Sequence, residues 1–350
     1  MTVARTKGSV IPLDEAIEQL QSPYALEAFS ALTGEPVLVV DLSSTTVAPS
    51  KEALARVRET LAQLPCPSVA LCTDLSTPGA QWLGDRFDVV VGEEEELALI
   101  LKTSQRTPLA AMSLVQLLRH TEKLSIHEGL IAESWVYSKL QSGPEFAAWR
   151  ARHHKVGERA ANAEPAVLIQ RSGPRVRLTL NRPEKHNAYC AEMRDGLVEG
   201  LQLARSDPSV EAVVLAGAGS SFCAGGDLDE FGTLPDPATA HAVRSTRNAA
   251  RQLAAIAERV EAELHGACIG AGIELPAFAG HVSASEDAFF QLPEVQMGLI
   301  PGAGGSVSIP RRIGRQRTAL LALTGLRLRP EQALRWGLID RITRRDHAGA

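Results

Sequence analysis

The stretch 265-HGACIGAGIELPAFAG-280 is built almost wholly from apolar and small residues, yet it contains one carboxylate, that of Glu274. Burying an ionised carboxylate in apolar surroundings is costly unless the group is paired or its pKa rises until it is neutral. Glycines ahead of the glutamate expose backbone N–H groups where a helix begins, and we expect a helix from about residue 271. The stretch therefore predicts a polar site inside an apolar frame.

Three other segments carry glycine loops or a second carboxylate: 222-FCAGGDL-228, 291-QLPE-294 and 298-GLIPGAGG-305. Glycine-rich turns at two helix starts can aim their N–H groups at one oxygen, which makes an oxyanion hole. Two carboxylates beside it would supply acid–base chemistry at the neighbouring carbons. Neither loop matches GxGxxG or GxxxxGK[ST], so the sequence disfavours nucleotide-dependent chemistry.

Taken singly, each of these signals has a plain structural interpretation. A glycine loop after a strand is usually only a turn, and a glutamate in a helix usually lies on the solvated face. Four such segments in this order favour a catalytic site over four unrelated turns.

The composition bounds the class of protein. The chain has 350 residues, 45% of them hydrophobic, and a net charge of -5, so no nucleic-acid surface is expected. Five cysteines match no zinc spacing, and neither a signal peptide nor a membrane span is evident. We expect a soluble cytoplasmic protein without a metal, in which the basic clusters 311-RRIGRQR-317 and 341-RITRR-345 are solvated.

Both halves of the chain read as alternating strands and helices, which predicts crossover connections and a largely parallel α/β architecture. The polar segment 155–165 reads as a linker between the halves, and their shared opening order suggests a degraded internal repeat. The acidic run 93-EEEE-96 should open a helix. We expect strands at 36–42, 68–75, 87–91, 175–181, 210–219 and 281–290, a strand or loop at 263–269, helices at 51–64, 108–120, 122–152, 191–205, 238–262 and 310–325, and helix, turn and strand over 330–342.

The second half resembles the crotonase family, the enoyl-CoA hydratases and isomerases. The resemblance implies a crotonase-like ββα spiral core over about residues 165–342, in a catalytic domain of residues 165–350. An additional N-terminal domain, α/β and then helical, would occupy residues 1–155, with a degenerate crotonase-like repeat as one interpretation. The matching motifs, in family order, are 181-NRPEKHNA-188, 222-FCAGGDL-228, 265-HGACIGAGIEL-275, 291-QLPEVQMGLIPGAGG-305 and 322-ALTGLRLRPEQALRWGLID-340.

The resemblance also implies roles for individual residues. The backbone N–H groups of Gly226 and Ala271 would form the oxyanion hole for a thioester carbonyl. Glu274 and Glu294 match the two catalytic glutamates of the hydratases. No metal or separate cofactor is implied, since coenzyme A belongs to the substrate. Substrate and CoA contacts would come from Lys185, His186, Asn187, Ala188, Ala224, Gly225 and Asp227.

The retention of both glutamates favours an enoyl-CoA hydratase, which adds water in the syn sense across an α,β-unsaturated acyl-CoA thioester. Another enolate reaction stays open, either double-bond isomerisation or the cofactor-independent oxygenation found in a branch with an N-terminal extension. A non-catalytic acyl-CoA or protein binder is the third hypothesis. Two apposed carboxylates argue against it.

Family members continue past the strand that matches 337-GLID-340 with helices that cover the acyl pocket and help build the trimer. Because the chain ends at Ala350, we expect the helical stretch 108–152 to cover the active site or an oligomer interface instead. A homo-oligomer, a trimer or hexamer by resemblance, is expected. The aromatic residues of this stretch should be helix-packing residues: Trp135, Tyr137, Phe146 and Trp149.

Overall fold

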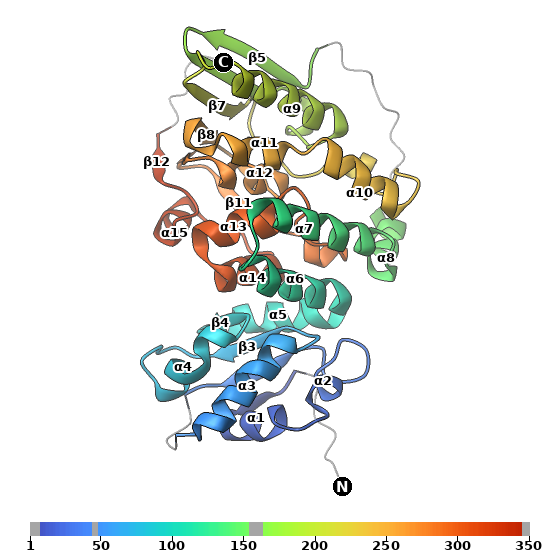
Figure 1. Ribbon diagram of the computed structural model, residues 1–350, viewed down its shortest axis with the longest axis vertical. Coiled ribbons are helices and arrows are strands. Elements are labelled where there is room, and N and C mark those ends of the chain that lie inside the picture. Colours follow the sequence, from blue (N-terminus) through green and yellow to red (C-terminus); the bar gives the residue numbers. More distant parts are fainter. Residues whose placement is uncertain (1–7, 44–47, 154–163, 345–350) are drawn as a thin grey trace.

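The computed structural model describes residues 8–43, 48–153 and 164–344. The chain is organised around two separate sheets, which lie toward opposite ends of the molecule with helices between them (Figure 1). Mixed α/β architecture is thus confirmed. No helix among the described residues is long and apolar enough to cross a membrane.

The N-terminal sheet has four parallel strands in the order β1-β2-β3-β4. The second, third and fourth strands are largely buried on both faces, as expected of parallel sheets, whereas the first, at the sheet edge, exposes Val10 and Pro12. These strands are β1 Val10–Pro12, β2 Leu38–Asp41, β3 Ser68–Leu71 and β4 Val89–Val91, and the helices around them are α1 Leu13–Leu20, α2 Ala25–Ala28, α3 Lys51–Gln63, α4 Pro78–Leu83 and the 3-10 turn η1 Gly84–Arg86.

Four helices follow this sheet and connect it to the rest of the chain. The acidic run opens α5 Glu94–Arg106, as predicted from the helix dipole. After it come α6 Pro108–Thr121, α7 Ile126–Gln141 and α8 Pro144–His153. The single helix expected over 122–152 is wrong, because the chain breaks before Pro144 and Glu145 turns back to cap α6 by accepting hydrogen bonds from the amides of Leu109 and Ala110.

The second sheet has six strands in the order β12-β10-β8-β7-β6-β5, all parallel except the antiparallel pair β5 and β6. A two-stranded parallel sheet, β9 with β11, lies beside it. The bounds are β5 Val167–Ser172, β6 Arg175–Leu180, β7 Ala212–Gly217, β8 Val260–Leu264, β9 Ala267–Ile269, β10 His281–Ser285, β11 Phe289–Gln291 and β12 Arg341–Thr343.

The helices of this half mostly follow the sequence pattern, with two corrections. The helix expected over 238–262 is two helices, because Asn248 caps a new start and the last residues form β8. The helix expected over 310–325 is also two, divided at Gly314, whose φ is +82°. The bounds are α9 Ala191–Ser206, α10 Pro237–Thr246, α11 Ala249–Ala255, α12 Ala271–Glu274, α13 Gly305–Ile313, α14 Arg315–Thr324 and α15 Pro330–Trp336, with 3-10 turns η2 Pro183–Lys185, η3 Leu228–Glu230, η4 Ala257–Arg259, η5 Pro276–Phe278 and η6 Glu294–Met297.

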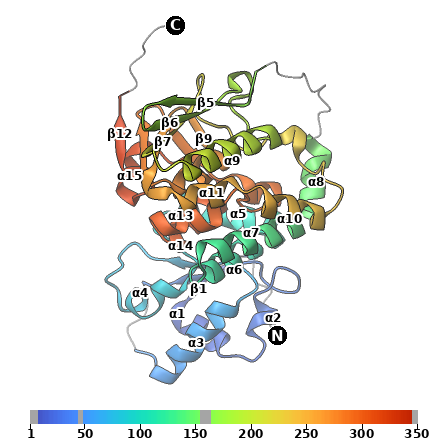
Figure 2. The same ribbon diagram turned by 45° about the horizontal axis from the view of Figure 1, so that its top comes forward.

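One of the two hydrophobic clusters is common to both halves, whereas the other lies wholly in the N-terminal half, between Ile11 and Phe87. Buried side chains form a continuous cluster from Val39 of the first sheet to Ile339 near the second. Helices α6 and α7 pack on α13, and α7 also packs on α10 (Figure 2, in which the top of the molecule is tilted forward). The helical stretch therefore lies against the second half. The boundary at 155–165 and the repeat stay predictions, and most of that linker lies outside the described residues.

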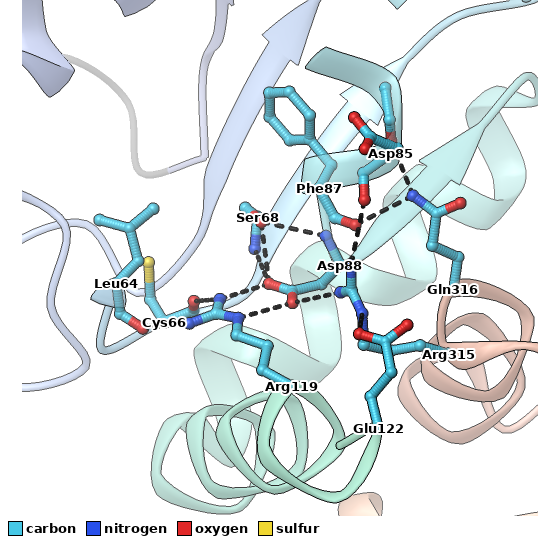
Figure 3. Close-up of polar contacts among 11 residues, drawn as sticks. Leu64, Cys66, Ser68, Asp85, Phe87, Asp88, Arg119, Glu122, Arg315 and Gln316 are labelled. Atoms are coloured by element: carbon cyan, nitrogen blue, oxygen red, sulfur yellow. Dashed lines mark hydrogen bonds and ion pairs between the residues drawn. The ribbon is translucent and has the colours of Figure 1, made fainter. Parts of the chain in front are cut away.

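A buried carboxylate joins the first sheet to helix α6 of the N-terminal half and to helix α14 of the second half (Figure 3). Asp88 is 1% exposed and pairs with Arg119 of α6 at 2.5 Å and Arg315 of α14 at 3.1 Å. Ser68 donates its backbone N–H and its hydroxyl to the same carboxylate, at 2.9 and 2.8 Å. The solvated helix predicted for 311–317 is therefore wrong at Arg315, because tertiary packing covers it.

Candidate active site

Two chain segments that are far apart in sequence meet edge to edge at the site. Cys223 and Cys268 form a parallel bridge, and a second bridge joins Tyr189 to Gly226. Glycine permits the sharp turns that follow, since φ is +98° at Gly225 and +50° at Gly270. The start of α12 and the loop at 222–227 consequently face the same space.

The amides of Gly226 and Ala271 face one cavity of about 1070 Å³ that opens to solvent. In the described part of the chain, no backbone or side-chain acceptor receives a hydrogen bond from either amide. Ala271 is at the first position of α12, where a helix leaves its N–H groups unpaired. Two such donors lining one cavity are the arrangement that an oxyanion hole needs.

The carboxylates of Glu274 and Glu294 converge beside this pair of amides. A Cβ built on Gly270 would lie 2.4 Å from Oε1 of Glu294 and 3.6 Å from Oε1 of Glu274. Glu274 comes from the end of α12 and Glu294 from the start of η6. Both line the cavity, so one small group can contact both oxygens.

The carboxylate of Glu274 is held rigidly. Its Oε2 accepts hydrogen bonds from the amides of Ala303 at 2.7 Å and Gly305 at 2.9 Å. Burial raises the pKa of Glu274 well above its usual value, and the charges of Glu294 and Glu133 raise it further, while the two amide bonds act in the opposite direction. These amide bonds favour the ionised form of Glu274.

Glu294 has a different environment. Its Oε2 is buried and accepts no hydrogen bond from any described residue. Burial raises the pKa of Glu294 to about 8, with the charge of Glu133 adding to the effect against the opposing bond from its own backbone N–H. A carboxyl group with this pKa is protonated at neutral pH and can donate a proton.

A third carboxylate, which the sequence analysis missed, enters from the N-terminal half. Glu133 of α7 is buried and accepts hydrogen bonds from the amides of Gly304 at 2.7 Å and Ser306 at 2.9 Å, and from the Ser306 hydroxyl at 2.6 Å. Burial raises its pKa to about 7. The available signal was its spacing, since Glu133 shares a helix face with Leu130 and Tyr137.

Helix α7 forms one wall of the cavity. Tyr137 packs on Gly302, where a Cβ would lie 2.3 Å from the ring, and Arg244 of α10 lies over the other side, 4.9 Å from the ring centroid. Tyr137 and Trp149 pack against the hydrophobic core, as predicted, and Tyr137 also lines the cavity. Phe146 is buried, whereas Trp135 is 60% exposed and is not a packing residue.

In the segment 185–188, which we expected along the CoA moiety, one side chain makes hydrogen bonds within the protein. The Asn187 side chain is buried, accepts from the Arg182 amide, and donates to the carbonyls of Ala218 and Ser221. It holds the loop and has no group left for substrate. Among the predicted contact residues, Asp227 lines the cavity, whereas Lys185, His186, Asn187, Ala188, Ala224 and Gly225 are outside its lining.

Lys185 and Asp227 form a small charged cluster at the cavity edge. Lys185 Nζ lies 2.7 Å from Asp229 and 3.5 Å from Asp227, and Asp227 also pairs with the buried Arg182 at 3.1 Å. Asp227 further accepts a hydrogen bond from the Asp229 amide. These contacts tie the loop after Gly226 to the segment around Arg182 and Lys185.

The residues that the structure describes contain no group of three or more histidine, cysteine, aspartate or glutamate side chains placed to hold a metal ion. The five cysteines are buried and free.

A family model described as enoyl-CoA hydratase/isomerase matches residues 175–348. The 2,3-dehydroadipyl-CoA hydratase of Escherichia coli is 33% identical over 176 residues, 50% of this chain and 68% of that protein. The 1,2-epoxyphenylacetyl-CoA isomerase of the same organism is 39% identical over 169 residues, which are 47% of this chain and 64% of that protein. Mevalonyl-coenzyme A hydratase of Aspergillus fumigatus is 35% identical over 169 residues, which are 48% of this chain and 63% of that protein.

Solved structures with similar sequences include enoyl-CoA hydratases. The enoyl-CoA hydratase from Thermoplasma volcanium has 34% sequence identity and a TM-score of 0.48, over 51% of this chain and 72% of that one. The chain spans slightly less than two thirds of the length of several curated relatives that it matches.

Proposed function

This chain belongs to the enoyl-CoA hydratase/isomerase family, and on that premise we propose that it is an enoyl-CoA hydratase. The reaction is the syn addition of water to an α,β-unsaturated acyl-CoA thioester. One observation carries the proposal: Oε1 of Glu274 and Oε1 of Glu294 flank the same point at Gly270, beside the unpaired amides of Gly226 and Ala271.

In the proposed mechanism the thioester carbonyl oxygen accepts hydrogen bonds from the amides of Gly226 and Ala271. Charge that develops on this oxygen is stabilised most in the enolate-like transition state, where preorganised donors contribute most to the rate. The α- and β-carbons then lie toward the two carboxylates.

Proton transfer would be divided between the glutamates. Ionised Glu274, oriented by the amides of Ala303 and Gly305, accepts a proton from water as its oxygen bonds to the β-carbon. Glu294 donates its proton to the α-carbon. Since both oxygens approach from one side, hydroxyl and proton add to the same face. The proton taken up by Glu274 passes to Glu294 and restores the pair.

Further parts of the proposal rest on the composition of the sequence and on the family resemblance. Coenzyme A is part of the substrate, and no separate cofactor takes part. The protein acts in the cytoplasm as a homo-oligomer, a trimer or hexamer, without nucleic-acid or membrane partners. The mass of the particle in solution tests the oligomeric state.

The test is the loss of the conjugated-thioester absorbance when the full chain meets a trans-2-enoyl-CoA, together with the mass of the product. Addition of one water, with Glu274→Gln and Glu294→Gln each abolishing the reaction, supports the hydratase. A product of unchanged mass with a shifted double bond would replace it with an isomerase. Binding of acyl-CoA without turnover on any enoyl-CoA would leave only a binder.

A further inference from the structure

The cavity contains an arginine whose charge is not paired with a carboxylate of any residue that the structure describes. Arg244 extends from α10 to α7, where its Nε lies 3.2 Å from Ser134 Oγ and its Nη1 lies 3.5 Å from Gln141 Oε1. Its Nη2 donates to Ser138 Oγ. All of these partners are neutral, and the guanidinium also lies over the Tyr137 ring.

The carboxylates of Glu133 and Asp195 already bind other groups of the protein. Both oxygens of Glu133 are occupied by hydrogen bonds from Gly304 and Ser306. Asp195 pairs with Arg194 and Arg247. Within the described ranges, no carboxylate lies in ion-pair distance of Arg244, although the two other cavity arginines, Arg194 and Arg247, are paired.

An unpaired cation in a mostly buried position is destabilising, because it loses hydration without gaining an opposite charge. Burial accordingly lowers the pKa of Arg244, against the opposing influence of Tyr137 and Glu133. The serine and glutamine contacts hold the guanidinium in place but do not neutralise it. Such a group is matched to a ligand that brings the missing negative charge into the cavity.

The cavity lining is mostly apolar, with Leu130, Phe231 and Leu234 among its residues, but it includes further polar groups. The hydroxyl groups of Tyr137 and Tyr189 and the Asn248 side chain belong to residues that line the same cavity. A purely aliphatic acyl chain would desolvate these groups without replacing their hydrogen bonds, which costs binding free energy. A polar chain end would satisfy them.

We infer that Arg244 binds a carboxylate at the far end of the acyl chain, so that the substrates are CoA thioesters of 2-enoic acids carrying a second carboxylate. This inference rests on the proposed function, since the thioester must sit at the amides of Gly226 and Ala271 with its α- and β-carbons at the glutamates. Arg244 is then a specificity-determining residue that forms a charge-assisted, two-pronged contact.

The position of Arg244 favours the acyl end of the substrate over the CoA end. It reaches the cavity from α10, against the Tyr137 ring, which packs on Gly302 next to the loop that orients Glu274. Lys185 belongs to the predicted CoA segment, where it pairs with Asp227, and it is outside the cavity lining.

Pairs of trans-2-enoyl-CoA thioesters with acyl chains of about five to eight carbons test the inference. The two members of a pair have the same number of carbons, but one ends in a methyl group and the other in a carboxylate. We expect kcat/KM to be about 10- to 100-fold higher for the carboxylate member of at least one pair. Binding of glutaryl-CoA against pentanoyl-CoA gives the same comparison without turnover, so failure of the hydratase proposal does not hide the result.

The variant Arg244→Met should remove this preference or reverse it, while Arg244→Lys should retain part of it. The matched control is Arg247→Met, because Arg247 lines the same cavity but pairs with Asp195 and Glu199. It should leave the ratio within each pair unchanged.

Three results would overturn the inference. In the first, wild-type protein shows kcat/KM and affinity for the methyl-ended member of every pair that equal or exceed those for the carboxylate-ended member. Arg244→Met could weaken both members of every pair by the same factor, which would assign Arg244 a purely structural role. The same variant could weaken free coenzyme A equally, which would place Arg244 at the CoA moiety. If neither member turns over but glutaryl-CoA binds preferentially and Arg244→Met removes that preference, the inference stands and the hydratase fails.

Discussion

Glu133 and Glu274 are bound by alternate amides of one turn. The amides of Ala303 and Gly305 donate to Glu274, and those of Gly304 and Ser306 donate to Glu133. The start of α13 thus lies between a carboxylate of the proposed catalytic pair and a carboxylate supplied by the N-terminal half. Glu133 is a positioning residue, because it holds the turn that orients Glu274.

Replacing Glu133 tests this positioning role. In Glu133→Gln one amide of the turn would face an NH₂ group instead of an oxygen, so the turn and Glu274 should shift. We expect kcat for hydration to fall about 10- to 100-fold with little change in KM, as misplacement of reacting groups typically does. Steady-state kinetics on a trans-2-enoyl-CoA measures both constants.

Glu128→Gln on the same helix is the control, because Glu128 is exposed and serves only the cap with Ser125. It should lower thermal stability slightly and leave kcat unchanged. If Glu133→Gln lowers Tm but retains full kcat, Glu133 only stabilises the fold.

The pH dependence of the reaction follows from Glu294. Its pKa is raised to about 8, chiefly by burial, and the proposed mechanism requires its protonated form. The group is protonated below this value, so kcat/KM should fall as pH rises through about 8. Because the three carboxyl groups interact, this apparent value belongs to the set.

Glu133→Gln should shift this falling limb to lower pH. The negative charge of Glu133 raises the pKa of Glu294, so its removal lowers that pKa. A pH–rate profile of wild type and variant measures the shift. A limb that stays in place in the variant would separate Glu133 from the titration of Glu294.

Gly270 tests the geometry of the carboxylate pair. In Gly270→Ala the new Cβ would lie 2.4 Å from Oε1 of Glu294 and must displace it. Hydration should fall by at least about 100-fold, since the reacting groups lose their alignment. The control is Gly173→Ala, where φ is +57° against +50° at Gly270 but nothing lies within 4 Å of the added carbon. The control shares the positive φ, and full activity of both variants would contradict the proposed pair.

Asp88 tests how firmly the N-terminal sheet is attached. Asp88→Asn would leave Arg119 and Arg315 without their buried counter-charge, and we expect a loss of about 3–5 kcal/mol in the free energy of unfolding. Urea denaturation followed by circular dichroism measures it. In Asp85→Asn, whose carboxylate pairs with the half-exposed Arg86, the loss should be about 0–1 kcal/mol. Equal losses in the two variants would show that the junction is not held by this ion network.

Local pattern was sufficient for most of the secondary structure. Helical periodicity and acidic first turns predicted α3 and α5, and strand propensity predicted β2 and β6. The failures occurred at breaks inside long polar or apolar runs, such as Asn248 and Gly314, where one capping residue decides between one helix and two.

The sequence by itself determined the core of the candidate site. Gly226, Ala271, Glu274 and Glu294 lie in short segments whose glycines dictate the turns, so their chemistry is readable along the chain. Tertiary structure alone decided what surrounds them. Glu133 meets Gly304 across 171 positions of sequence, and Arg244 loses its solvent because α7 packs on α10. No local pattern encodes such meetings, because they depend on which distant apolar faces are buried together.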